Sequence, residues 1–349
     1  MPERRQSFQI GYQLLSWGRA YPRNWWAGVG ACAAAGFAGV EGQATIAGVY
    51  AGREAVFADR MARLGTRLTA LYSTTDFDRS AERAKNREKN RRAARFLRRM
   101  GARVLVAGGR DAAPGRAEDL AEIARQANAL GREIWETDGI RFALHPHVGS
   151  RLADRAALDQ VMDVTDPRHV FVCLDTAHLA AAGMDPADTL RTYAGRIAHV
   201  HCKDYVPEAR DGLEIFAALG QGTLDWPGIV HALEAIGYDG WANVELDQTA
   251  DPAAAARRNY GYLTETLRLK VAGPPRAAAN RDTAVGCVAG ARRRRAEGGQ
   301  QPPVSSLAKS VRVPGGVSSR SRGRRPGEPR NSSEVSSESR RANRPGGRL

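Results

Sequence analysis

The chain has 349 residues, 42% of them apolar, which is enough to bury the core of one large domain or two medium ones. Its formal net charge is +14 at pH 7, but residues 271–349 hold 17 Lys/Arg and 5 Asp/Glu, which leaves 35 and 33 for residues 1–270. The first 270 residues are therefore nearly neutral, and nucleic acid is not the partner that their charge indicates.

The cysteines and the N-terminus exclude further classes of protein. Cys32, Cys173, Cys202 and Cys287 form no Cys-x-x-Cys pair, which argues against a zinc ribbon and against a disulfide framework. The opening residues MPERRQSF lead into a strand-like segment without the apolar region of a signal peptide. No apolar stretch approaches the length of a membrane span, so we expect no membrane partner and a cytoplasmic, reduced protein.

Short apolar segments alternate with longer helical patterns over the first 270 residues. Strands are expected at residues 8–14, 37–41, 68–72, 104–107, 141–145, 170–175, 197–201 and 241–245. Helical patterns lie between and after them, at residues 25–35, 54–64, 80–100, 117–130, 155–164, 186–193, 227–236 and 253–267. These eight strand–helix units predict an α/β fold, a closed (β/α)₈ TIM barrel with a parallel sheet, over residues 1–270.

Aspartate and glycine mark the ends of these helices. Asp185-Pro and Asp225-Trp-Pro place a capping carboxylate just before a proline of the first helical turn, which predicts helix starts. Residues 83–99 are very basic, and their helical pattern favours a solvated helix face over a phosphate-binding one. A glycine after a helical pattern predicts a C-cap, and we expect one at Gly36, Gly65, Gly101, Gly131 and Gly237.

The composition changes after Lys270. Residues 271–349 are rich in Arg, Ser, Gly and Pro and nearly free of aromatic residues. Such a segment buries too little apolar area to offset the loss of chain entropy on folding, so we expect a disordered basic tail. Nonspecific binding of polyanions by this tail and the absence of any function both remain open.

Candidate functional residues follow from the barrel prediction, because catalytic groups of such barrels lie at the C-terminal ends of the strands. The first four predicted strand ends offer Trp17, Glu41, Tyr72 and Gly108-Gly109. The last four offer His145-Pro-His147, Asp175-Thr-Ala-His178, His199-Val-His201-Cys-Lys203-Asp204 and Glu245-Leu-Asp247.

These four consecutive ends should converge on one mouth of the barrel. Each residue alone has a structural explanation, such as capping for Asp175. Their joint placement instead favours a divalent metal site. A mixed set of His, Asp and Glu suits Mn²⁺, Mg²⁺, Co²⁺ or Zn²⁺, and its oxygen ligands favour the first two. We take Mn²⁺ as the first choice.

The order of motifs resembles the xylose-isomerase-like barrel superfamily of sugar phosphate isomerases and epimerases, which also includes inosose dehydratases and endonucleases of the endonuclease IV type. The resemblance covers residues 8 to about 268. The motifs look closest to the inosose-dehydratase branch. They are FAGVE (37–41), ALHPHVGS (143–150), CLDTAHLAAAGMDP (173–186), IAHVHCKD (197–204) and LGQGTLDWPGIVHALEAIGYDGWANVELD (219–247).

The resemblance implies roles for individual residues. Asp175, His201 and Glu245 match the metal ligands of the superfamily. The fourth ligand of the superfamily comes from the fifth strand and is usually Glu. Here the match is His145 or His147. Relatives carry a second Glu shortly afterwards, where this chain has Ala153, next to Asp154. We assign His147 as the ligand and leave His145 and Asp154 open.

The remaining site residues match the substrate side of the superfamily. His178 and Lys203 look like substrate-contacting residues, and Trp17 is expected to contact the substrate as well. Glu41 is expected to contact substrate or to form a structural salt link.

The chemistry that the resemblance implies is proton abstraction next to a carbonyl, through an enediolate, in a small sugar or cyclic polyol. Glu245 is expected to be ligand and base, with His145 or His147 opposite, while Lys203 holds a hydroxyl or the oxyanion. We expect a metal-dependent isomerase or epimerase. The alternative is an inosose dehydratase that shares the first half-reaction, with His178 assisting the departure of a hydroxyl group.

Two other classes are weighed against these. An endonuclease of the endonuclease IV type needs additional histidines where this chain has Tyr72 and Gly108, which disfavours it. A non-catalytic binding protein is suggested by Ala153. A homo-oligomer is also possible, through aromatic residues that we expect to be exposed: Trp25, Trp26 and Tyr50.

Overall fold

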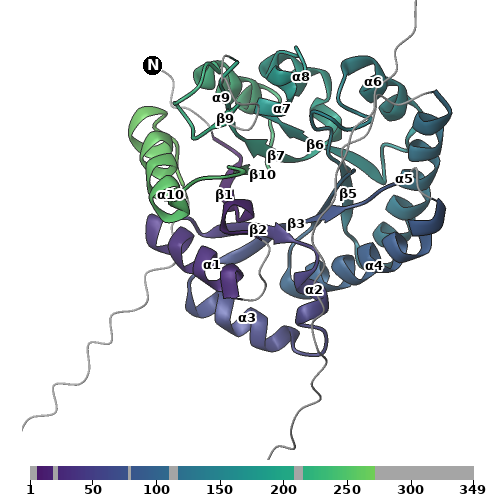
Figure 1. The fold of residues 1–349 in the computed structure, drawn as a ribbon, viewed down its shortest axis with the longest axis horizontal. Coiled ribbons are helices and arrows are strands. Elements are labelled where there is room, and N and C mark those ends of the chain that lie inside the picture. The colour runs from purple at the N-terminus through teal and green to yellow at the C-terminus, as the bar shows by residue number, and fades with distance from the viewer. Residues whose placement is uncertain (1–5, 19–22, 78–79, 110–116, 208–214, 272–349) are drawn as a thin grey trace, which may run out of the picture. The chain divides into compact units, whose positions relative to one another are not determined.

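The structure is a computed structural model that describes residues 6–18, 23–77, 80–109, 117–207 and 215–271. Eight parallel strands close into a barrel in the order β1-β10-β7-β6-β5-β4-β3-β2, and helices surround it (Figure 1). The predicted (β/α)₈ barrel is confirmed. The barrel strands are β1 Gln9–Gln13, β2 Gly39–Gln43, β3 Arg67–Thr74, β4 Val104–Gly108, β5 Arg141–Leu144, β6 Val170–Asp175, β7 Ile197–Cys202 and β10 Trp241–Val244.

Helices follow the strands in the order expected for a (β/α)₈ barrel. A short antiparallel pair, β8 (Asp204–Tyr205) and β9 (Phe216–Ala217), is added after β7. Asp185 and Asp225 cap the two helices predicted for them, accepting from the amides of Asp188 and Gly228. The helices are α1 Arg23–Ala35, α2 Ile46–Val49, α3 Glu54–Arg63, α4 Arg83–Met100, α5 Ala117–Asp138, α6 Arg155–Val164, α7 Thr176–Ala181, α8 Pro186–Thr192, α9 Trp226–Ala235 and α10 Pro252–Gly261.

The chain divides into two units between Thr283 and Ala284, and every described residue belongs to the first unit. The predicted tail at 271–349 lies outside the described residues except for Val271. Within the described ranges, the helices are too short or too polar to cross a membrane.

Four of the five predicted glycine caps have the left-handed backbone that such caps require, at Gly36, Gly65, Gly101 and Gly237. The prediction at Gly131 is wrong. Helix α5 continues through it to Asp138, and Gly139, with φ of +67°, follows the helix end. A Cβ on Gly131 would lie 2.7 Å from the His169 carbonyl oxygen. Glycine at this position therefore allows α5 to pack closely against the backbone of His169, just before β6.

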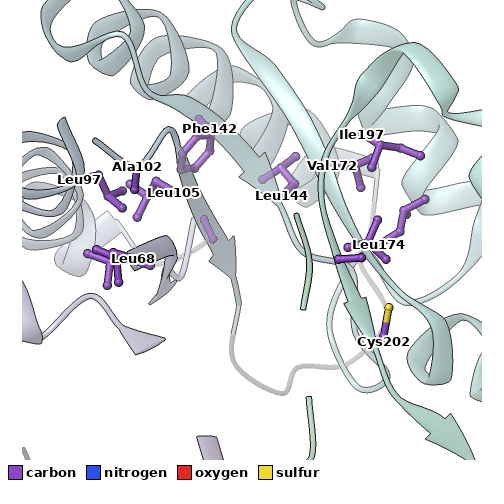
Figure 2. Packing of buried hydrophobic residues seen from close by; sticks show 14 of the residues in the cluster. Leu68, Leu97, Ala102, Leu105, Phe142, Leu144, Val172, Leu174, Ile197 and Cys202 are labelled. Carbon is purple, nitrogen blue, oxygen red and sulfur yellow. The ribbon is translucent and has the colours of Figure 1, made fainter. Parts of the chain in front are cut away.

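The main hydrophobic core lies between the strands and the surrounding helices. Figure 2 shows part of this cluster, in which Leu105 of β4 and Phe142 of β5 belong with Leu97 of α4. Inside the barrel, small residues such as Ala143 and Cys173 form a second cluster. Two residues later come His145, directly after β5, and Asp175, the last residue of β6. The alternation of strand side chains therefore takes the inner face from apolar to polar toward the C-terminal end.

The aromatic residues expected on the surface are buried, so this basis for a homo-oligomer is wrong. The exposed fractions of Trp25, Trp26 and Tyr50 are 1%, 8% and 8%. All three pack against Phe57 of α3, with ring centroids 5.1 to 5.6 Å apart. Helices α1 and α3 bring these rings together, which the local pattern did not indicate.

The basic face of α4 forms ion pairs with acidic residues of α5. Arg83 Nη2 lies 2.7 Å from Glu122 Oε1, and Arg87 Nε lies 2.7 Å from Glu133 Oε2. These pairs agree with the expectation of a solvated helix face.

Candidate active site at the C-terminal ends of the strands

A pocket of about 600 Å³ opens at the C-terminal ends of the strands. Residues from the first half of the barrel supply uncharged polar groups to its wall, namely Gln13, Gln43, Tyr72 and Thr74. The second half supplies His145, His178, Phe216, Glu245 and Asp247. The pocket therefore lies where the active site of such a barrel is expected.

His201 of β7 stands at the centre of a buried group of metal-ligating side chains. Its Nδ1 lies 2.9 Å from Glu245 Oε2, 3.0 Å from His145 Nε2 and 4.0 Å from Asp175 Oδ2. One ligating atom from each of Asp175, His201 and Glu245 lies within 4.8 Å of the others. The structure thus brings together three residues that the sequence analysis assigned as metal ligands.

These side chains fit a divalent cation. Asp175 Oδ1 caps α7, whereas its Oδ2 is buried and has no hydrogen-bond partner among the described residues. The nearest cation to this oxygen is the Lys203 ammonium at 3.5 Å, too far for a strong hydrogen bond, and the single Nδ1 of His201 cannot hydrogen-bond to three neighbours at once. A cation shared by Asp175, His201 and Glu245 would satisfy these atoms, with His145 close by. Two carboxylates and imidazole suit Mn²⁺, Co²⁺ or Zn²⁺.

Lys203 is fully buried beside this group. Its Nζ donates to Glu245 Oε1 at 2.8 Å and to Asp247 Oδ1 at 2.7 Å, and lies 3.5 Å from Asp175 Oδ2. Burial opposes the charge of Lys203, but the three carboxylates outweigh burial and hold its pKa well above its usual value. Burial likewise opposes ionisation of Glu245, but Lys203 and His201 hold the pKa of its carboxyl well below its usual value. Both groups are therefore charged near neutral pH.

His145 and His178 are neutral members of the site. Burial, reinforced by His201, lowers the pKa of His145 well below its usual value. Burial, reinforced by Lys203, does the same for His178. The amide of Val148 donates to His178 Nδ1 at 3.3 Å, so the ring hydrogen of His178 lies on Nε2. His178 is therefore a neutral N–H donor in the pocket wall.

The other candidates for the fourth ligand have other partners. The Nδ1 and Nε2 atoms of His147 lie 2.9 and 3.0 Å from the carbonyl oxygens of Val148 and Gly109. Asp154 caps α6 by accepting from the amide of Ala157 at 2.8 Å. His147, our first assignment, lines the pocket with both ring nitrogens on backbone carbonyls, whereas Nε2 of His145 lies 3.0 Å from His201 Nδ1.

Trp17 and Glu41, which we expected to contact substrate, lie outside the pocket lining. The chain turns after β1, so Leu15 reaches the wall while Trp17 packs against Tyr12, with ring centroids 5.7 Å apart. Glu41 is fully buried on the inner face of β2, and its Oε2 lies 2.9 Å from His201 Nε2. Of the two alternatives given for Glu41, the structure places it in a buried ion pair.

The sequence analysis missed several pocket residues. Gln43 and Thr74 lie two residues after Glu41 and Tyr72, so extending the strand period past the first polar residue would have found them. Phe216 had no comparable signal. It belongs to the β8–β9 pair, and its ring lies 4.6 Å from that of His178. Gln13, Leu15 and Val148 were missed as well, whereas Asp247 had been named at the last predicted strand end.

Comparison with known proteins shows a family match for most of the barrel. A family model described as "Xylose isomerase-like TIM barrel" matches residues 29–266. An inosose dehydratase of Lacticaseibacillus casei is 32% identical over 206 residues, which cover 50% of this chain and 68% of that protein. The inosose dehydratase of Geobacillus thermodenitrificans is also 32% identical, and the chain spans about half of it, 53%.

Solved structures share the fold. The 3-keto-D-glucoside 4-epimerase of E. coli superposes with a TM-score of 0.61 at 19% identity, covering 74% of this chain and 99% of that one. A protein described as IOLI with a bound zinc atom superposes with a TM-score of 0.61 at 16% identity, covering 74% and 98%.

Proposed function

Because this chain belongs to the xylose isomerase-like TIM barrel family, we propose that it acts on a small sugar or cyclic polyol that carries a ketone. In this proposal a divalent metal ion, with Mn²⁺ the first choice and Co²⁺, Mg²⁺ or Zn²⁺ the alternatives, is held by Asp175, His201 and Glu245. The reaction begins with removal of a proton next to the carbonyl. An isomerase or epimerase and a dehydratase share this first half-reaction.

The observation that carries the proposal is the convergence of Asp175, His201 and Glu245 at the pocket. Their ligating atoms lie within 4.8 Å of one another although they come from three strands. Asp175 Oδ2 remains buried without a hydrogen-bond partner in the described part of the chain, which favours a bound cation over a structural ion-pair network.

The pocket wall supports an uncharged, hydroxylated substrate. Gln13, Gln43 and Thr74 offer amide and hydroxyl groups that pair with alcohols. No arginine or lysine is among the described residues of the lining, and Lys203 behind it is already matched by carboxylates. Among these described residues, a phosphate group would find no cation of its own.

Each side chain of the site has a separate role in the proposed reaction. When bound, the cation polarises the carbonyl and stabilises negative charge on its oxygen. Glu245 reaches the pocket wall and removes the proton, and the Lys203 ammonium stabilises the negative charge that develops. The Nε2–H of His178 donates a hydrogen bond to the hydroxyl group that departs in a dehydration. The neutral state of His178 makes it a hydrogen-bond donor rather than a strong acid.

The second half-reaction decides between a lyase and an isomerase. Return of the proton gives an isomer or epimer. Departure of a hydroxyl group from the neighbouring carbon, which takes up the abstracted proton and leaves as water, gives a dehydrated product instead. The curated relatives at 32% identity are inosose dehydratases, which supports dehydration of an inosose for this chain. Isomerisation or epimerisation of a ketose is the other outcome of the same test.

A substrate screen tests the proposal. The purified chain with Mn²⁺ or Co²⁺ is incubated with a panel of inososes and ketoses, and products are analysed by mass spectrometry. Loss of one water identifies a dehydratase, and an unchanged mass with a new retention time identifies an isomerase or epimerase. Glu245→Gln is expected to lower turnover by at least about 100-fold, because it removes the base.

Glu136→Gln on the exposed face of α5 is the matched control and is expected to keep the wild-type rate. Wild-type turnover by Glu245→Gln would contradict the assigned base. Absence of turnover on the whole panel, together with substoichiometric metal, would favour the non-catalytic alternative.

A further inference from the structure

We propose that Glu41 is a positioning residue that fixes the tautomer of His201, so that the Nδ1 lone pair of His201 faces Asp175 and Glu245. This inference rests on the proposed metal site. It gives a role to a buried carboxylate that neither lines the pocket nor belongs to the ligand group around His201 Nδ1.

Three nitrogen atoms of other side chains lie within hydrogen-bond distance of one carboxylate oxygen of Glu41. Its Oε2 lies 2.9 Å from His201 Nε2, 2.9 Å from His199 Nε2 and 3.0 Å from Asn243 Nδ2. Glu41, both histidines and Asn243 are fully buried, so water does not compete for these contacts. A carboxylate only accepts hydrogen bonds, and each facing nitrogen therefore has to carry a hydrogen.

The hydrogen on His201 Nε2 determines what the other ring nitrogen can do. Without a cation, Nδ1 also faces a carboxylate, Glu245 Oε2, and carries a hydrogen of its own. A bound cation would take the place of that hydrogen, and the hydrogen that Glu41 holds at Nε2 then leaves the lone pair of the neutral ring on Nδ1. That atom is the one that faces Glu245 Oε2 at 2.9 Å and Asp175 Oδ2 at 4.0 Å. Coordination of a cation needs this lone pair, and a carboxylate at the opposite ring nitrogen orients the ring and raises its basicity.

Glu41 is itself held by the inner faces of neighbouring strands. Asn243 Nδ2 contacts Thr69 Oγ1 at 2.8 Å as well as Glu41, and Thr69 Oγ1 donates to the Val40 carbonyl at 3.1 Å. Gly11 leaves the space for this amide, because a Cβ there would lie 2.3 Å from Asn243 Oδ1. The network joins β2, β3, β7 and β10 across the barrel, so Glu41 has no freedom to swing toward a substrate.

The test measures Mn²⁺ binding by calorimetry on the full chain. Glu41→Gln keeps the shape of the side chain but adds an N–H donor, which permits the other tautomer of His201. The dissociation constant for Mn²⁺ is expected to rise at least about tenfold. Glu41→Asp stays an acceptor and is expected to bind Mn²⁺ more tightly than Glu41→Gln.

A matched control separates positioning from folding. Asp204 is another fully buried carboxylate, and it accepts from the amides of Gly220 and Leu224 and from Trp226 Nε1, without contact to His201. Asp204→Asn is expected to lower the melting temperature of the metal-free chain and to leave Mn²⁺ affinity unchanged. If Glu41→Gln behaves in the same way, the inference is overturned.

A second variant keeps the test decisive if Glu41→Gln does not fold. Asn243→Ser removes one donor that holds Glu41 without touching His201, and a smaller rise of the dissociation constant is expected. Wild-type affinity in this variant and in Glu41→Asp would then overturn the inference. If the wild-type chain binds no Mn²⁺, the proposed function and this inference fail together. If the wild-type chain binds Mn²⁺ and the variants bind it with the same affinity, only this inference fails and the proposed function stands.

Discussion

His145 and His147 are two residues apart, yet the structure gives their rings different partners. His145 Nε2 lies 3.0 Å from His201 Nδ1, whereas both nitrogens of His147 face backbone carbonyls. His145 directly follows β5, and its amide bonds to the Ala107 carbonyl of β4, which directs its side chain into the barrel. His147 lies in the loop beyond Pro146. The end of β5 therefore decides which imidazole faces His201.

This difference predicts unequal effects on metal binding. His145→Ala is expected to raise the dissociation constant for Mn²⁺ about tenfold or more, because it removes a nitrogen beside His201. His147→Ala is the matched control and is expected to leave that constant unchanged. Calorimetric titration with Mn²⁺ measures both, and the melting temperatures of the metal-free variants report folding. The reverse order of affinities would return the fourth position to His147.

At the scale of elements, helix ends were less predictable than helix positions. The pattern at residues 117–130 identified α5 but ended at Leu130, eight residues before the end of the helix at Asp138. The pattern at 253–267 is divided in the structure into α10 and a π-helical turn, Tyr262–Thr266. A glycine after a helical pattern predicts a helix end, but glycine also occurs inside a helix where the helix packs closely against backbone.

Two helical glycines test this explanation. Gly131→Ala is expected to lower the free energy of unfolding by about 1–3 kcal/mol, because its Cβ would meet the His169 carbonyl oxygen 2.7 Å away. Gly30→Ala in α1 has open space around its Cβ and is expected to raise the free energy of unfolding by about 0.5–1 kcal/mol. Urea denaturation measures both. Stabilisation by Gly131→Ala would show that the approach of α5 is not constrained by this residue.

At the scale of the whole chain, the two ends of the described barrel are hydrogen-bonded to each other just before the basic segment. Gln6 Nε2 donates to the Lys270 carbonyl at 2.9 Å, and the Lys270 amide donates to Gln6 Oε1 at 2.8 Å. Residues 271–349, with 17 Lys/Arg against 5 Asp/Glu, begin where this closure ends. We propose that any binding of polyanions resides in this segment and that the barrel contributes none.

Comparison of the full chain with a chain ending at Val271 tests this assignment. The full chain is expected to bind heparin with an affinity that falls steeply as salt rises, because counterions are released on binding. The shortened chain is expected to lose this binding and to keep the melting temperature and Mn²⁺ affinity of the barrel. Equal heparin affinity of both chains would place the polyanion site on the barrel.

The amino-acid sequence by itself determined the barrel and the order of the strand ends that carry the proposed metal ligands. Strand and helix periods are local properties, and they place Asp175, His201 and Glu245 at C-terminal ends of parallel strands without further information. The residues that define the pocket beyond these three were only partly predictable, since Gln43 and Thr74 follow the strand period and Phe216 does not.

Only the tertiary structure decided which side chains meet. The pairing of Glu41 with His201, the choice between His145 and His147, and the burial of Trp25 depend on contacts between segments far apart in the chain. Local patterns fix the face of a strand on which a residue lies. The curvature of the barrel fixes which residues lie opposite that face, because β2 and β7 are separated by β1 and β10 in the strand order and their side chains meet only in the barrel interior.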